Sequence, residues 1–182
     1  MSTDVIRGFF EEGEPVRRRQ TLVHFSSATD LWATPQTLFE ELDAEFDFSL
    51  DVCALSTNAK CSRYFTPEID GLVQPWGGVC WMNPPYGKAI GKWVQKAFES
   101  AQAGVTVVCL LPLRTDTNWW HEYVTKADEV WFVRGRIRFG DAAANAPFPS
   151  VIVTFRGKKP VQTRWTRGVF YRRSRLGERT SP

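Results

Sequence analysis

The chain has 182 residues, of which 43% are hydrophobic and 24% are charged, and its formal net charge is +3 at pH 7. This length predicts one domain with a single hydrophobic core, and the composition is typical of a soluble globular protein. No run of about 18 apolar residues exists, which excludes a membrane-spanning helix. The N-terminal segment is rich in acids and arginines, so we expect no signal peptide there.

The four cysteines and two histidines show no spacing typical of a metal site. No C-x-x-C motif is present, and we therefore expect no zinc or other metal ion. Three of the cysteines lie in apolar stretches. They are interpreted as reduced thiols of an enzyme in the cytoplasm of a bacterium or a phage-infected cell.

The positive charge is concentrated at the C-terminal end of the chain. Residues 156–182 hold nine Lys or Arg and one acid, whereas residues 1–155 hold 14 basic and 19 acidic residues. A basic tail on a slightly acidic core favours a polyanionic partner, because neutralised phosphates release counterions. A solvated tail that binds nothing specific is the alternative.

The first half of the chain gives a helix and a strand between irregular stretches. Residues 1–28 show no hydrophobic period and are expected to form a loose arm. A helix is predicted from Thr34 as N-cap, with Pro35 at the first helical position and apolar residues at helical spacing after it. FSLDVCA (48–54) predicts a short buried strand that ends in an acid, and residues 55–78 are expected to be mostly irregular.

The second half alternates strands and helices. In order, we expect a strand running into a rigid loop (79–87), a helix (89–103), a central strand (105–111), a shorter helix (118–125) and two strands (129–135 and 150–155). This pattern predicts an α/β fold with a mainly parallel sheet. The last two strands have no helix between them, so we expect the last strand to be antiparallel. The predicted organisation is an arm (1–28), one domain (29–156) and a basic tail (157–182).

The tetrapeptide Asn83-Pro84-Pro85-Tyr86 lies between a predicted strand and a predicted helix. Ligands of open α/β sheets bind outside the carboxyl ends of the strands. Two prolines remove two N–H donors, which leaves a rim rich in hydrogen-bond acceptors. Such a rim suits a substrate that donates from an –NH2 group, and Tyr86 offers a flat face for a planar ring. An ordinary Pro-Pro loop with a packed tyrosine is the alternative.

This motif resembles the catalytic N/D-P-P-Y motif of S-adenosylmethionine-dependent amino-methyltransferases, which act on adenine N6, cytosine N4 or a glutamine amide. Seven motifs in order resemble the phage-type DNA N6-adenine methyltransferases (the Dam family) over about two thirds of the chain. They are W-A-T-P-x-x-L-F-E-E-L (32–42), F-x-F-x-L-D-V-C-A (46–54), D-G-L (70–72), W-M-N-P-P-Y (81–86), W-V-x-K-A (93–97), L-L-P-L-R-T-D-T-x-W-W (110–120) and G-R-I-R-F (135–139).

The resemblance implies a Rossmann-like methyltransferase fold, S-adenosylmethionine as cofactor and double-stranded DNA as partner. Trp32, Thr34 and Pro35 belong to the motif that precedes the cofactor strand, where a Thr hydroxyl and nearby backbone N–H groups would bind the methionine carboxylate. Asp51 matches the acid that pairs with the methionine ammonium. The alternative to this cofactor contact is that Asp51 caps the loop that follows it.

The same resemblance places Asp70 near the adenine of the cofactor and Asn83 between the target amine and the cofactor. Asp70-Gly71 is also a good turn dipeptide, which is the alternative for this acid. The cofactor region departs from many relatives. Asn83 follows Asp51 by only 32 positions, and no G-x-G loop lies near Asp51. We expect an abbreviated Rossmann-like pocket whose ribose contact is not identified.

The mechanism that the resemblance implies concerns a weakly nucleophilic aromatic amine. Hydrogen bonds to the Asn83 side-chain oxygen and the Pro84 carbonyl would concentrate electron density on N6 of adenine. The methyl group would then transfer in line from the sulfonium, with the proton lost afterwards. The base would be flipped out of the duplex and stacked on Tyr86.

Arginines are the candidate DNA contacts. Arg136 and Arg138 precede a loop that reaches Pro149, and this segment is a candidate for closing over the base or touching phosphate. An ordinary basic strand end is the alternative. Three tail arginines are expected to contact phosphates rather than bases, namely Arg172, Arg173 and Arg175. Recognition of the DNA sequence is expected to come from the arm, the loop at 139–149 or the tail. By default, the chain is expected to be a monomer.

Three other functions compete with adenine methylation. Cytosine N4 methylation is the nearest, although those enzymes usually have Ser at the position of Asn83. Glutamine-amide methyltransferases normally carry the G-x-G loop that is absent here. A DNA-binding module without catalysis is the third, and the complete set of motif residues argues against it.

Overall fold

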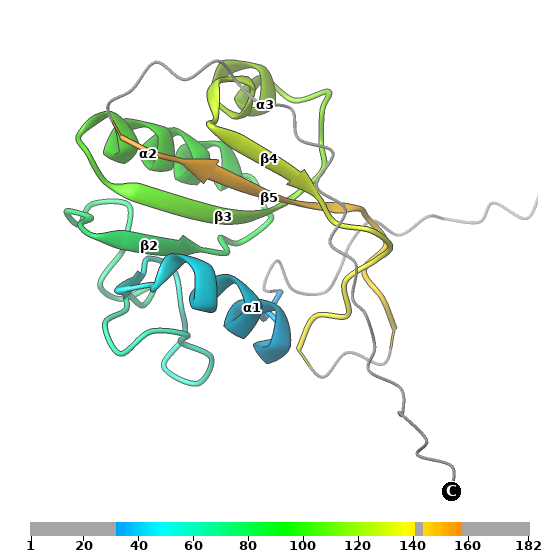
Figure 1. The fold of residues 1–182 in the computed structure, drawn as a ribbon, viewed down its shortest axis with the longest axis horizontal. Helices are drawn as coiled ribbons and strands as arrows, with labels where there is room; N and C mark the ends of the chain where they lie inside the picture. Colours follow the sequence, from blue (N-terminus) through cyan, green and yellow to red (C-terminus); the bar gives the residue numbers. More distant parts are fainter. Residues whose placement is uncertain (1–31, 141–143, 158–182) are drawn as a thin grey trace, which may run out of the picture.

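The computed structural model describes residues 32–140 and 144–157. The predicted arm at 1–28 lies outside these residues, as does the predicted tail beyond Gly157. The described residues form a five-stranded sheet in the order β1-β2-β3-β5-β4 (Figure 1). Its strands are β1 (Leu50–Asp51), β2 (Val79–Met82), β3 (Thr106–Pro112), β4 (Glu129–Phe132) and β5 (Ser150–Phe155).

The strand directions confirm the predicted mostly parallel sheet with an antiparallel last strand. β1, β2 and β3 pair in parallel, whereas β5 runs antiparallel to both β3 and β4. β3 and β5 are central, and almost every residue in them is buried. A strand covered on both faces needs a nearly continuous apolar sequence, which explains why both were recognisable from sequence.

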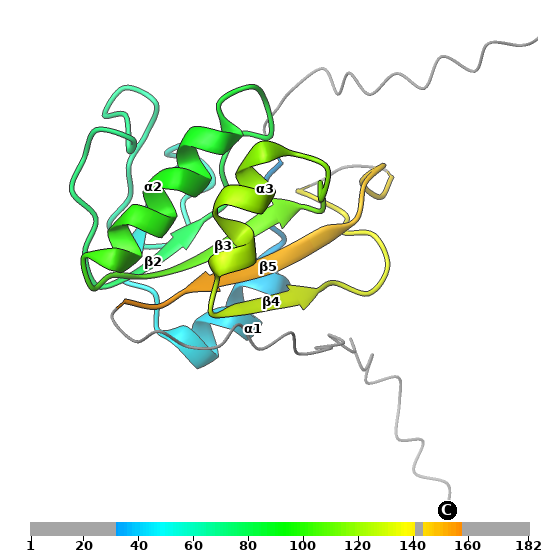
Figure 2. The same cartoon turned by 90° about the horizontal axis from the view of Figure 1, so that it is seen from above.

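Helices cover both faces of the sheet. α2 and α3 lie over one face and α1 lies over the other, and both perpendicular views show this arrangement (Figures 1 and 2). The helical elements are α1 (Gln36–Phe46), α2 (Ile90–Gln102), α3 (Asn118–Glu122) and the 3₁₀ turn η1 (Val124–Lys126). α2 presents an apolar stripe to the sheet and ends before Gly104, which has a φ of +101°. The described residues contain no helix long and apolar enough to cross a membrane.

Two predicted boundaries are wrong in ways that matter for the site. α1 begins at Gln36 with Pro35 in the cap position, and no side chain caps it, so Thr34 is not the N-cap. The strand expected over 48–54 has only two residues in the ladder. On its other edge, Asp51 exchanges backbone hydrogen bonds with a returning segment: its N–H donates to the Arg63 carbonyl and its carbonyl accepts from Phe65.

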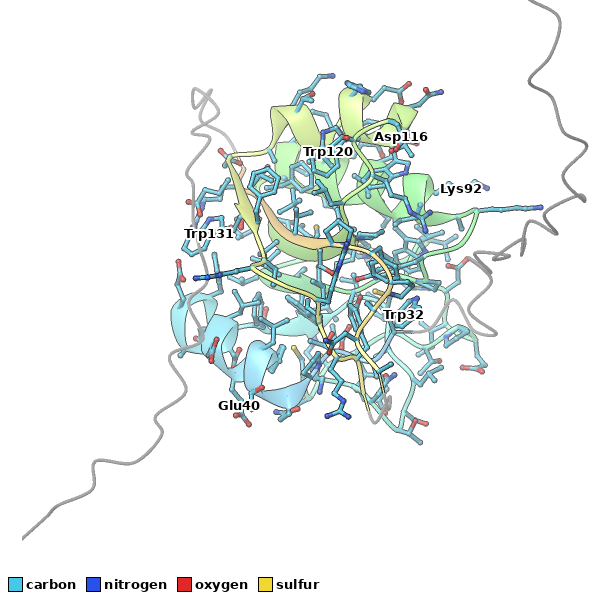
Figure 3. All side chains as sticks on the ribbon, turned by 90° about the vertical axis from the view of Figure 1, so that its right-hand side faces the viewer. Trp32, Glu40, Lys92, Asp116, Trp120 and Trp131 are labelled. Atoms are coloured by element: carbon cyan, nitrogen blue, oxygen red, sulfur yellow. The ribbon has the colours of Figure 1, made fainter. Side chains whose placement is uncertain are left out.

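The core is aromatic and contains the two adjacent tryptophans of α3. Trp119 and Trp120 are both buried. All four cysteines are free thiols, and burial raises the pKa of Cys109 well above its ordinary value. Figure 3 shows Trp120 near α3 and Trp32 beside the loop that follows β4. There the Trp32 ring packs edge-on against Phe139 and Phe148.

Candidate active site

A cavity of about 260 Å³ opens at the carboxyl ends of β1 and β2. The parallel register sets Asp51 opposite Trp81, and Asn83 directly follows β2. Most of the predicted catalytic and cofactor-binding residues lie in its wall, whereas Pro35 and Tyr86 are not among its lining residues. The predicted residues that line the cavity are Trp32, Thr34, Asp51, Asp70, Asn83, Pro84 and Pro85.

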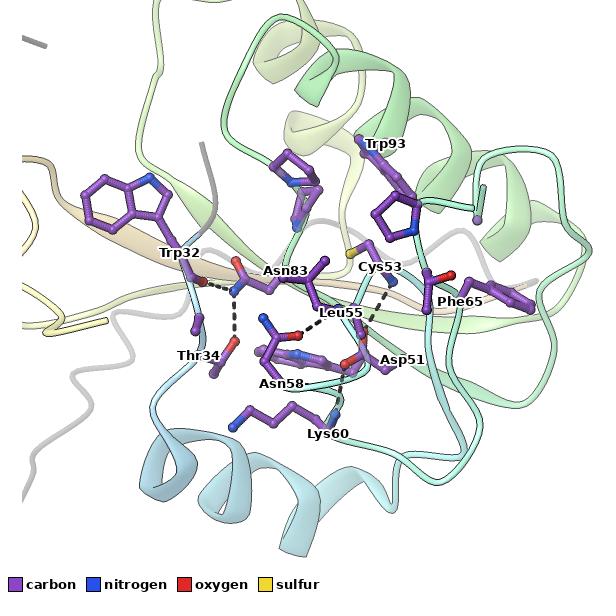
Figure 4. A pocket seen from close by; sticks show the side chains of 18 of the residues that line it. Trp32, Thr34, Asp51, Cys53, Leu55, Asn58, Lys60, Phe65, Asn83 and Trp93 are labelled. Atoms are coloured by element: carbon purple, nitrogen blue, oxygen red, sulfur yellow. Dashed lines mark hydrogen bonds between the residues drawn. The ribbon is translucent and has the colours of Figure 1, made fainter. Parts of the chain in front are cut away.

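Two hydrogen bonds fix the side-chain amide of Asn83 in the wall of the cavity. Its Nδ2 donates to the backbone carbonyl of Trp32 and, at 2.9 Å, to Oγ1 of Thr34 (Figure 4). Its Oδ1 is buried and has no hydrogen-bond partner in the described structure. A buried acceptor without a donor costs free energy, so this oxygen is ready for a donor supplied by a ligand.

Asp51 places a buried carboxylate in the same cavity. Its two oxygens accept hydrogen bonds from the backbone N–H groups of Cys53 (3.3 Å) and Lys60 (3.1 Å). No cationic side chain of the described residues lies within ion-pairing distance of it. Burial raises the pKa of Asp51 to about 6, and the two backbone hydrogen bonds limit the rise. The carboxylate is therefore complementary to a cationic ligand group.

Aromatic rings form the other end of the cavity. Trp93 and Phe65 lie on the side of Asp51 away from Thr34 (Figure 4). Gly71 permits this wall, because a Cβ there would lie 2.1 Å from the Val52 carbonyl oxygen and 3.2 Å from the Trp93 ring. The cavity thus combines a charged end with an aromatic end suited to a planar heterocycle.

Asp70 has the conformation of a turn residue while also bordering the cavity. Its φ is +53°, and its carboxylate accepts a hydrogen bond from the N–H of Leu72 at 3.0 Å. The side chain is exposed. Asp70 therefore builds a turn, as the alternative interpretation expected, and it borders the cavity, while its place near the cofactor adenine stays a prediction.

Tyr86 is not the open stacking platform that the sequence suggested. Its side chain is 3% exposed, and its hydroxyl donates to the Leu110 carbonyl at 3.2 Å. Phe139 and Phe148 pack against its ring in edge-on arrangements. Burial within this aromatic cluster covers the face that a flipped base would need.

Arg136 and Arg138 lie on the segment that packs beside the site. Both are exposed, and they alternate with the buried Ile137 and Phe139, so their side chains face outward. A backbone hydrogen bond from Gly140 to Ala33 ties this segment to the strip that holds Trp32 and Thr34. The tail residues Arg172, Arg173 and Arg175 lie outside the described residues.

Several lining residues were not predicted, and most come from the segment judged irregular. That segment supplies Leu55, Asn58, Lys60, Phe65, Thr66, Pro67 and Gly71, and the other unpredicted residues are Ala33, Cys53, Ala54, Trp81 and Trp93. The segment has no hydrophobic period, so nothing in its sequence pattern indicates that it returns to pair with β1 through Tyr64. The described residues contain no cluster of His, Cys, Asp or Glu suited to a metal ion.

Comparison with known proteins identifies the family. The family model described as DNA N-6-adenine-methyltransferase (Dam) matches residues 23–164. The chain belongs to this family. It is 34% identical over 143 residues to the DNA N-6-adenine-methyltransferase of Haemophilus phage HP1, an alignment that covers 74% of this chain and 83% of that protein.

Two further relatives agree with the Dam family. The DNA N-6-adenine-methyltransferase of Escherichia phage T1 is 30% identical over 107 residues, which cover 57% of this chain and 44% of that protein. The putative methyltransferase YfdM of Escherichia coli is 35% identical over 65 residues, which cover 31% of this chain and 71% of that protein. Membership of the Dam family makes the chain a DNA adenine-N6 methyltransferase, in preference to the cytosine and glutamine-amide alternatives.

Proposed function

We propose that the cavity binds S-adenosylmethionine and that Asn83 presents Oδ1 to the N6 amine of an adenine extruded from DNA. The observation that carries this proposal is the buried, unpartnered Oδ1, held by two hydrogen bonds from Nδ2. An aromatic amine has hydrogens to donate to such an acceptor, and the neighbouring Pro84 carbonyl is the second acceptor that we assign.

The residues present fit this cofactor at both ends of the cavity. Asp51 has a buried carboxylate without a cationic partner among the described side chains, and it would hold the methionine ammonium. Trp93 and Phe65 would enclose the adenine ring of the cofactor, and Asp70 stands at the rim of the same cavity. This arrangement supports an abbreviated Rossmann-like pocket without a glycine-rich loop, in which residues 32–35 form the strip next to the target.

Asn83 acts by orientation and electrostatics rather than by covalent chemistry. When bound, the cofactor supplies an electrophilic methyl group on a sulfonium. Oδ1 of Asn83 accepts one N6 hydrogen and draws electron density toward the nitrogen, while Thr34 and the Trp32 carbonyl keep the amide from rotating. Pre-oriented acceptors of this kind lower a barrier without reorganisation during the reaction.

In our proposal, double-stranded DNA binds to a basic surface beside this site. The exposed Arg136 and Arg138 would contact phosphates next to the cavity, and Arg172, Arg173 and Arg175 would add sequence-independent affinity. Replacing the three tail arginines by Gln should weaken DNA binding and flatten its salt dependence, by about 0.9 in log–log slope for each phosphate that is no longer neutralised. An unchanged slope would remove the tail from the interface. The cytoplasmic location and monomeric state expected from the sequence stay predictions.

Calorimetry with S-adenosylmethionine tests the cofactor assignment apart from catalysis. We expect the wild type to bind, Asp51→Ala to lose about tenfold or more in affinity through the missing charge partner, and Asn83→Ala to bind nearly as well as the wild type. Equal loss in both variants, or no binding by the wild type, would contradict the division of roles between these residues.

A further inference from the structure

The cavity is also lined by a cationic side chain that the proposed function does not use. Lys60 lines it, from the segment that returns to β1, and is partly buried. The backbone N–H of Lys60 holds Asp51, whereas its side chain runs past Asn58 toward the Thr34 side (Figure 4). One residue thus touches the buried carboxylate through its backbone and carries a positive charge into a different part of the cavity.

The ammonium group of Lys60 has a neutral partner. Its Nζ donates to Oε1 of Gln36 at 2.7 Å, and no carboxylate of the described residues lies within ion-pairing distance of it. A lysine ammonium has three donors and no acceptor, so donors remain for an anion. Partial burial lowers its pKa, while the nearby charges of Asp51 and Glu40 oppose that shift.

Two charges of opposite sign therefore border one cavity. Asp51 and Lys60 are linked through the backbone but do not form an ion pair with each other. The amino-acid end of S-adenosylmethionine is a zwitterion whose ammonium and carboxylate share one carbon atom. A buried carboxylate and an ammonium group that border the same cavity are complementary to the two charges of such a group.

We propose that Lys60, rather than the Thr34 hydroxyl that the family resemblance suggested, binds the methionine carboxylate of the cofactor, next to the ammonium held by Asp51. This inference rests on the proposed cofactor pocket and names a residue in it that takes the place of the absent glycine-rich loop. It also gives a role to the return of the irregular segment at 55–66 to β1: the returning chain delivers both the backbone donor for Asp51 and the cation for the carboxylate.

A pair of ligands that differ only in the carboxylate gives the test. Calorimetry would compare S-adenosylmethionine with decarboxylated S-adenosylmethionine on the full chain, its Lys60→Met and Lys60→Arg variants, and Lys92→Met as the control. Lys92 is exposed on α2 and does not line the cavity. We expect Lys60→Met to weaken S-adenosylmethionine binding about tenfold and to leave the decarboxylated compound unchanged, with Lys60→Arg retaining most of the affinity and Lys92→Met unchanged.

Each other outcome has a definite meaning. Equal weakening of both ligands by Lys60→Met would overturn the proposal, because it would show a structural role in positioning Asp51. No weakening of either ligand would overturn it as well. Failure of the wild type to bind either ligand would instead reject the cofactor pocket itself, and this inference would fall with it.

Discussion

Nδ2 of Asn83 donates to the backbone carbonyl of Trp32, which lies 51 positions earlier in the chain. A carbonyl oxygen only accepts hydrogen bonds, so the amide nitrogen must face Trp32 and Oδ1 must face the other way. Thr34 supports the same orientation by accepting from Nδ2 at 2.9 Å. The orientation of the acceptor that we assign to the target amine is therefore set by the strip that precedes α1.

Replacing Asn83 by Asp removes the donor and keeps the size of the side chain. A carboxylate has no hydrogen for the Trp32 carbonyl, so the two oxygens repel and the side chain loses its fixed orientation. We expect kcat to fall by about 10²-fold or more, measured by initial rates of methyl transfer to DNA. Cofactor affinity serves as the control and should change little. A kcat for Asn83→Asp within a few-fold of the wild-type value would contradict the orienting role of Trp32.

Thr34→Val tests the second support of the amide. Valine keeps the shape of Thr34 and removes Oγ1, so Nδ2 of Asn83 loses one of its two acceptors. We expect kcat to fall about five- to tenfold with little change in KM for DNA, and Thr34→Ser to restore most of the activity. A change confined to KM would instead make Thr34 a substrate contact.

The buried carboxylate of Asp51 makes cofactor binding depend on pH. Burial raises its pKa to about 6, so the group is charged above this pH and gains a proton as the pH falls through it. Since only the charged form attracts an ammonium, affinity for S-adenosylmethionine should be constant near pH 8 and fall about tenfold for each pH unit below 6. Calorimetry between about pH 5 and 8 measures this, and Asp51→Asn should bind weakly with a flat profile. A wild-type affinity independent of pH would contradict the ammonium contact.

Gly71, which lines the cavity, and Gly77, which does not, form a matched pair for a packing test. A Cβ on Gly71 would lie 2.1 Å from the Val52 carbonyl oxygen, whereas one on Gly77 meets nothing within 4 Å. We expect Gly71→Ala to lower the free energy of unfolding in urea by about 1–3 kcal/mol and to weaken cofactor binding by displacing Trp93. Gly77→Ala should change stability by no more than about 0.5 kcal/mol. Equal effects of the two substitutions would refute the close-approach argument.

The elements with strong hydrophobic patterns were predictable from sequence. β3 is a nearly continuous apolar run because it is central and covered on both faces, and α2 has an apolar stripe because one side packs on the sheet. The position of Asn83 followed from the rule that ligands bind beyond the carboxyl ends of parallel strands. That rule and the family motif together brought Asp51 and Asn83 into one cavity.

The parts that depend on tertiary contacts were not predictable. Lys60 reaches the cavity only because residues 63–65 pair with Asp51, and such non-periodic pairing leaves no pattern in the sequence. The ring of Tyr86 was expected to be accessible to a base because the motif contains no information about Phe139 and Phe148. These two residues pack against the ring from a segment that is distant in the sequence. Thr34 looks like a helix cap in sequence, yet its hydroxyl is used by Asn83.

The most direct test of the assigned reaction is mass spectrometry of nucleosides from unmethylated DNA incubated with the purified protein and S-adenosylmethionine, beside an Asn83→Ala control. We predict N6-methyladenine with the wild type and its loss in the control, whose cofactor binding is retained. N6-methyladenine at equal levels from both proteins would contradict the role of Asn83, and a wild type that binds the cofactor but forms no N6-methyladenine would contradict the reaction itself.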